Sequence, residues 1–133
     1  MKQGRLHTAL FGVAAAAAIG LGSLVMSSRY ARDMYAMLLV FTAAVDVGAA
    51  LSQANSQTLL ASFTVASLFF SLALLGRWIG LEFLIVGYLA HAFLDALHGL
   101  RVVRTSVKTW WPPFCFCFDV TLAGLMYVRW VHA

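Results

Sequence analysis

The stretch IGLEFLIVGYLAHAFLDALHGL, residues 79–100, decides the fold class because it is an apolar run of membrane-spanning length. A helix needs roughly 17 to 25 mostly apolar residues to cross a hydrocarbon core about 30 Å thick. The same run carries His91, Asp95 and His98, although ionisable groups inside a bilayer are costly. The stretch therefore predicts both a transmembrane helix and the place where function is to be sought.

Four more apolar runs of similar length lie on either side of this stretch. The five expected spans are residues 6–25, 34–51, 58–75, 79–100 and about 110–130. The last run opens with two tryptophans and two prolines at 110–113, which suits the headgroup level and a first helical turn. We therefore predict an all-α fold, a polytopic membrane helix bundle of about five transmembrane helices that forms a single domain over residues 1–133.

The composition agrees with a membrane protein. Of 133 residues, 62% are apolar and 11% are charged, and the mean hydropathy is +0.88, whereas soluble domains carry about 25% charged residues. The net charge of +4 comes from Lys and Arg in expected loops or at helix ends, which fits lipid headgroups and not nucleic acid. We expect the N-terminal run to be a retained first helix, because no convincing cleavage site precedes a soluble domain.

The basic residues also bear on orientation. The N-terminal side would carry Lys2, Arg5, Arg101, Arg104 and Lys108, and the opposite side Arg29, Arg32, Arg77 and Arg129. The positive-inside rule therefore favours a cytoplasmic N-terminus by a single residue.

Acidic residues are unusually frequent inside the expected spans. The spans contain Asp46, Glu82, Asp95 and Asp119, and only Asp33 is expected in a loop, the turn at 27–33. A carboxylate at mid-membrane costs roughly 2.5 to 3.5 kcal/mol on insertion scales, so it normally faces the bundle interior and has a partner or a function. Glu82 begins the fourth span on the opposite side of the membrane, where we expect it to pair with Arg77.

His91, Asp95 and His98 share one helical face because they are spaced by four and three residues. Imidazole and carboxylate both ligate metal ions, and a carboxylate can also orient a ligating histidine. A helix face that supplies several such donors is typical of metal sites in helical bundles. The alternative is a chain of hydrogen bonds that only satisfies buried polar groups.

Consecutive spans cross the membrane in opposite directions, so two other spans bring carboxylates to the same side as the end of the fourth span. Asp46, Asp95 and Asp119 would each lie roughly 7 to 9 Å below the N-terminal side, if spans two, four and five are neighbours. Carboxylates packed together cannot all ionise in a low-dielectric site without a cation, a protonated histidine or a shared proton. We therefore predict a divalent transition metal, zinc or iron, with Asp46 and Asp119 as catalytic residues. The expected ligands are His91, Asp95, His98 and Asp119.

Cys115 lies one turn before Asp119 on the same helical face and could add a soft ligand. Buried cysteine is more often a small apolar filler, which is the alternative for this residue. With Cys117 it forms neither a CxxC redox motif nor a zinc-finger spacing. The two cysteines therefore do not indicate a redox compartment.

Two segments resemble a family of small bacterial integral membrane proteins described only as a domain of unknown function. They are GYLAHAFLDALH at 87–98 and PFCFCFD at 113–119, which follow a pattern of H-x-x-x-D-x-x-H, a Pro-containing loop and a Cys-rich segment ending in Asp. The chain departs from the family at Leu94, where a Trp is usual, and after His98, where the family doubles the histidine. The resemblance implies a bacterial inner membrane location but no reaction. The resemblance implies that one site contains His91, Asp95, His98, Cys115 and Asp119.

Three functions remain open from the sequence. The first is a metal-dependent membrane enzyme that acts on a lipid or another hydrophobic molecule, with a remaining carboxylate as general base. The second is an accessory subunit of a larger membrane complex that binds a haem or pigment through a histidine, or attaches through the small residues Gly12, Ala16 and Gly20. The third is a proton- or cation-coupled carrier, which in so short a chain requires a homo-oligomer.

Overall fold

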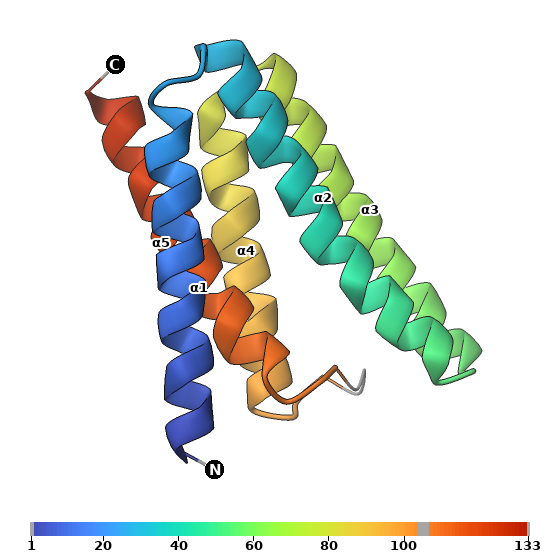
Figure 1. Cartoon of the computed structure of the whole chain (residues 1–133). Coiled ribbons are helices and arrows are strands. Elements are labelled where there is room, and N and C mark those ends of the chain that lie inside the picture. Colours follow the sequence, from blue (N-terminus) through green and yellow to red (C-terminus); the bar gives the residue numbers. More distant parts are fainter. Residues whose placement is uncertain (1, 104–106, 133) are drawn as a thin grey trace.

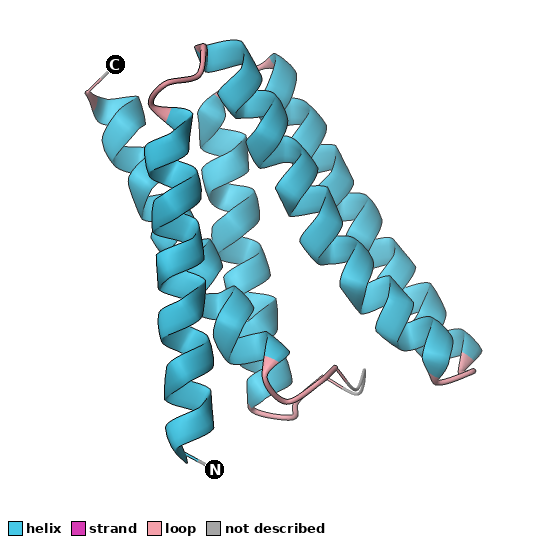
Figure 2. Cartoon of the chain, viewed as in Figure 1, coloured by secondary structure: helices cyan, strands magenta, loops and turns pink. Residues whose placement is uncertain are grey.

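Five helices run back and forth along one direction in the computed structural model, which describes residues 2–103 and 107–132 (Figure 1). They are α1 (Lys2–Ser23), α2 (Ser28–Ser52), α3 (Ser56–Trp78), α4 (Leu81–Gly99) and α5 (Trp111–Val131). Each helix is long and apolar enough to cross a membrane. Within the described part of the chain the remaining residues form loops, and no strand is present (Figure 2). The prediction of an all-α bundle with five potential spans is confirmed.

The termini and loops divide between the two ends of the bundle. The N-terminus, the α2–α3 turn and the loop before α5 lie at one end, and the C-terminus lies at the other (Figure 1). The described basic residues lie at the two ends that the alternating direction of the spans predicts. Arg104 lies outside the described residues. Orientation relative to a membrane stays a prediction.

The largest difference from the predicted boundaries is at the start of α2. This helix begins at Ser28 instead of residue 34, because the Ser27 side chain accepts a hydrogen bond from the backbone N–H of Tyr30 and caps the helix. Apolarity indicates which residues cross the hydrocarbon core, but helical hydrogen bonding continues into polar residues beyond it. The expected turn at 27–33 is therefore wrong, and Asp33 lies in a helix.

This change also alters the expected ion pair. Arg77, in the last turn of α3, forms an ion pair with Asp33 of α2, and its guanidinium lies 4.9 Å from the centre of the Trp78 ring. The predicted pairing of Arg77 with Glu82 is wrong. The extra helical turns at the start of α2 place Asp33 beside the end of α3, so the pair joins the two helices of one hairpin.

Two helix pairs form the bundle and α4 connects them. Helix α1 packs along α5, α2 packs along α3, and α4 contacts α5, α3 and α2. The α2–α3 hairpin leans away from the other helices toward the end that carries the α2–α3 turn (Figure 1). Fully buried side chains such as Leu39, Leu84 and Leu122 come from α2, α4 and α5 respectively. Helix α4 is therefore the central helix.

The small residues of α1 are used inside the chain. A Cβ at Gly12 would collide with the backbone carbonyl oxygen of Phe114, and one at Gly20 would meet the side chain of Leu125. Ala16, between them, is fully buried. These residues let α1 and α5 approach closely. Helix α5 therefore covers the ridge of Gly12, Ala16 and Gly20 within the chain, and attachment to a larger complex stays a prediction.

We expect Gly12→Ala to lower thermal stability and Gly124→Ala to preserve or raise it. Alanine is favoured over glycine in a helix by about 1 kcal/mol, but at Gly12 its methyl group forces α1 away from Phe114. Gly124 is a matched control because it also lies in a helix and a Cβ there meets nothing within 4 Å. The measurement is the midpoint of thermal unfolding in detergent. Equal midpoints for the two variants would contradict the close approach.

A buried polar cluster joins four helices near the end that carries the C-terminus. The Tyr35 hydroxyl donates to the Ser23 hydroxyl at 2.5 Å, and the Arg129 guanidinium donates to the Ser23 carbonyl at 2.9 Å. The Tyr88 hydroxyl donates to the backbone carbonyl of Tyr35 at 2.7 Å. These bonds satisfy groups that would otherwise be buried without partners, and they tie α1, α2, α4 and α5 together.

Candidate metal centre

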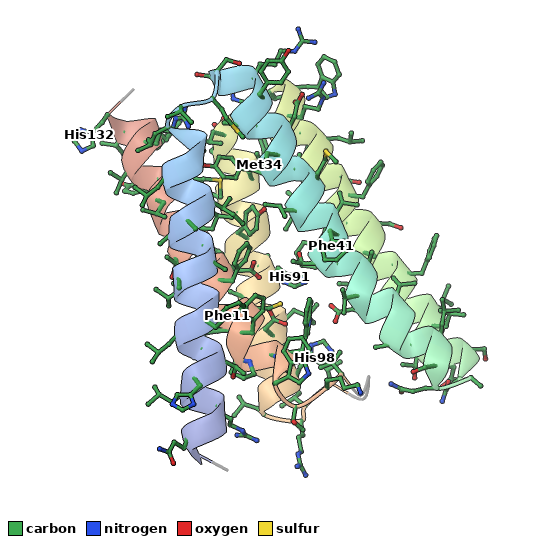
Figure 3. All side chains as sticks on the ribbon, in the orientation of Figure 1. Phe11, Met34, Phe41, His91, His98 and His132 are labelled. Carbon is green, nitrogen blue, oxygen red and sulfur yellow. The ribbon has the colours of Figure 1, made fainter. Side chains whose placement is uncertain are left out.

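His91 lies in the middle of the central helix α4 and is fully buried. Figure 3 shows it between the α2–α3 hairpin and the helices on the other side. Three carboxylates surround its ring, one each from α2, α4 and α5. They belong to Asp46, Asp95 and Asp119. The cluster therefore brings together residues that are distant in the sequence.

The local fold explains why these carboxylates meet. Asp95 lies one helical turn after His91, so both project from the same face of α4. Asp119 lies in the first half of α5, which begins at Trp111 with prolines in its first turn. Asp46 lies in the second half of α2. Helices α2 and α5 reach the centre because each packs against α4.

The two ring nitrogens of His91 face different carboxylates. Nδ1 forms a hydrogen bond with Oδ2 of Asp119 at 2.7 Å and lies 3.3 Å from Oδ2 of Asp95. Nε2 lies 3.7 Å from Oδ2 of Asp46, which is beyond hydrogen-bond distance. The Phe69 ring, from α3, packs against the imidazole in a T-shaped arrangement, with ring centroids 5.1 Å apart and an angle of 70° between the ring planes. Four helices thus contribute to the surroundings of this imidazole.

The three carboxylates offer more hydrogen-bond acceptors than the cluster has donors. Both oxygens of Asp46, both oxygens of Asp95 and Oδ1 of Asp119 are buried without a hydrogen-bond partner among the described residues. Three carboxylates surround one imidazole, which can carry at most one positive charge. Charge balance in a low-dielectric interior then requires additional protons or a cation. The orphaned oxygens fit a metal ion because oxygen and nitrogen are its usual donors.

The arrangement can hold a metal ion on geometric grounds. His91, Asp95 and Asp119 each offer a ligand atom, and these atoms lie within 4.8 Å of one another. Two ligands of one tetrahedral zinc ion lie roughly 3.4 Å apart, given bond lengths of about 2.1 Å. The His91–Asp119 separation of 2.7 Å is shorter than this, so an ion bound by both groups would replace their hydrogen bond. A small side-chain displacement would be sufficient.

His98 and Cys115 lie outside this group of three residues. Nδ1 of His98 bonds to the carbonyl of Leu94 in its own helix at 3.1 Å, and Figure 3 shows His98 nearer than His91 to the end that carries the N-terminus. The rise along α4 places His98 farther from His91 than Asp95 is. The role of His98 as a metal ligand stays a prediction. Cys115 is fully buried one turn before Asp119. Its role as a ligand stays a prediction.

The structure adds a pocket that sequence reasoning missed. It has a volume of about 710 Å³ and lies between the end of α4, the loop that follows, and the start of α5. Asp95 and His98 are among the residues that line it. The pocket depends on how Arg5 of α1, the end of α4 and the start of α5 come together. The hydropathy pattern carries no signal for it.

Comparison with known proteins adds no further assignment. No family model, curated protein or solved structure matches this chain. The resemblance to the bacterial membrane family therefore stays a prediction. The geometry of the cluster is the basis for the function proposed below.

Proposed function

We propose that this protein is a metal-dependent enzyme of a bacterial inner membrane that acts on a hydrophobic or amphiphilic substrate. The observation that carries the proposal is the set of orphaned carboxylate oxygens around His91, all buried between helices long enough to span a bilayer. Buried ionisable groups at such positions are costly and generally serve a function. A metal ion explains why three acidic side chains are gathered at one place.

The residues divide into two roles in this proposal. His91, Asp95 and Asp119 hold a divalent transition metal, zinc or iron, whose donor preferences match one imidazole and carboxylates. When bound, such a metal supplies Lewis acidity to an oxygen of the substrate. Asp46 is the general base, because it faces Nε2 of His91 at 3.7 Å and neither of its oxygens has a hydrogen-bond partner in the described chain.

Access to the cluster favours an enzyme over a carrier. On the side of the N-terminus, the pocket reaches Asp95 and His98. On the opposite side, the Tyr88 hydroxyl is held by the backbone carbonyl of Tyr35, which only accepts hydrogen bonds. Polar access from one side supports a site that receives a substrate and returns a product to the same side.

Metal analysis of the native protein tests the proposal. We expect purification without chelators to yield about one zinc or iron ion per chain, measured by mass spectrometry of the elements together with an optical spectrum. An iron or zinc ratio near zero, in protein that also takes up neither ion on dialysis, would overturn the proposal. An absorption spectrum typical of haem would indicate a different cofactor and would also contradict the proposal.

A further inference from the structure

The pocket at the end of α4 has its own chemical character. Its volume of about 710 Å³ is in the range of sites for small molecules, roughly 300 to 1,000 Å³. Arginines, buried polar groups and apolar side chains all contribute to its lining. The residues that define it are Arg5, Asp95, His98, Arg101, Pro113 and Phe116.

Two buried polar side chains line the pocket without satisfied hydrogen bonds. Asp95 is 1% exposed, and neither of its oxygens has a hydrogen-bond partner among the described residues, although Oδ2 lies 3.3 Å from Nδ1 of His91. His98 is 8% exposed, and its Nε2 likewise has none, although Nδ1 is held by the Leu94 carbonyl. Buried polar groups normally have partners. The metal centre proposed above accounts for Asp95, so Nε2 of His98 is the atom that indicates a polar group of a ligand.

The outer part of the pocket is cationic. Arg5 and Arg101 line it and are exposed, whereas Asp95 is the only acidic residue of the lining. Arg101 has a φ of 59°, a left-handed conformation that normally favours glycine after a helix. The bond from the Val102 amide to the Leu97 carbonyl closes the helix end around it. The fold therefore keeps an arginine at a position where glycine would be the easier residue.

We propose that this pocket binds an amphiphile with an anionic phosphate or carboxylate head group. The head group lies between Arg5 and Arg101, where charge-assisted hydrogen bonds are available. The apolar part packs against Pro113 and Phe116. The orientation follows from charge, because the two exposed arginines attract the anionic head group. Binding of the amphiphile does not depend on the proposed function. Only a reaction of the bound amphiphile at the metal centre rests on it.

A binding experiment with dodecyl phosphate tests this assignment. The full chain is placed in nanodiscs of phosphatidylcholine, and titration calorimetry is corrected with empty nanodiscs. We expect saturable binding that Arg5→Gln and Arg101→Gln each weaken roughly tenfold. Arg29→Gln is the matched control, because Arg29 is an exposed arginine at the opposite end of the bundle. It should leave the affinity unchanged.

Cys117 provides an independent measure of occupancy. It lines the pocket and is half-buried, whereas the other cysteine, Cys115, is fully buried and lies outside the lining. We expect dodecyl phosphate to slow the labelling of Cys117 by N-ethylmaleimide at the concentrations that saturate the calorimetric signal. Cys117→Ser gives the background labelling. Protection by dodecanol at equal concentration would show that the head group is not recognised.

Several outcomes would overturn the inference. Absence of saturable binding, or equal binding by both pocket variants and Arg29→Gln, would exclude recognition by Arg5 and Arg101. If inorganic phosphate binds as tightly as dodecyl phosphate, the pocket is a site for free anions and not for amphiphiles. A parallel titration with dodecanoate tests the carboxylate head group. The metal content of each batch is measured alongside. Binding in protein that neither contains nor takes up zinc or iron would support the pocket and contradict the metal centre, so failures of the two proposals are distinguishable.

Discussion

Replacing His91 with alanine is expected to remove the bound metal ion. His91 supplies the only nitrogen in the group of potential ligands, and its ring lies within 3.3 Å of both Asp95 and Asp119. Changes to residues that merely support metal ligands typically cost 10- to 100-fold in affinity, so loss of a ligand should cost at least about 100-fold. The measurement is metal content after dialysis against a defined concentration of zinc or iron.

Two asparagine variants separate the ligands from the proposed base. Asp95→Asn should lose most of the metal, whereas Asp46→Asn should retain it because Asp46 lies outside the group of three ligands. Both variants keep nearly the volume and shape of the side chain. Size-exclusion profiles and helical content confirm that each variant is folded. If Asp46→Asn loses the ion and Asp95→Asn keeps it, the ion lies on the Nε2 side of His91 and the proposed ligand set is wrong.

Removal of the metal by a chelator is expected to lower the thermal unfolding temperature markedly. An ion that binds only the folded state at 100 times its dissociation constant stabilises that state by about 2.7 kcal/mol. For a chain of this size that corresponds to a shift of roughly 10 °C. The chelator also restores the repulsion among Asp46, Asp95 and Asp119, which acts in the same direction. Fluorescence of the four tryptophans follows the unfolding.

The same scan with His91→Ala is the control for this effect. This variant should have a lower unfolding temperature than the metal-loaded native protein, and the chelator should not change it. Readdition of zinc or iron should restore the native temperature only for the native chain. An unfolding temperature that is the same with and without chelator in native protein of proven metal content would contradict a stabilising centre.

Part of the metal centre follows from spacing within one helix. His91 and Asp95 are one turn apart, so any helical structure at this segment places them together. The convergence of Asp46 and Asp119 on the same histidine required an additional assumption about neighbouring helices. The packing of α4 against both α2 and α5 supplies that condition. No spacing in the sequence signals the contribution of Phe69 or the pocket beside Asp95.

The sequence by itself determined the five helices and their potential to cross a membrane. Hydropathy and length are properties of each segment alone, and a long apolar segment has no other way to satisfy its backbone in a bilayer. Capping is also local, but the cap at Ser27 extended α2 beyond its apolar part and changed the partner of Arg77 to Asp33. Helix boundaries are therefore determined less well than helix identity.

Only the tertiary structure decided which helix faces meet. Hydrophobicity does not select neighbours in lipid, since the acyl chains are as apolar as the side chains, and close packing decides instead. This is why Gly12 and Gly20 face α5, and why Asp95 lies both in the cluster around His91 and in the lining of the pocket. A one-dimensional pattern indicates that a residue is buried, but the residue it contacts depends on the three-dimensional fit between helices.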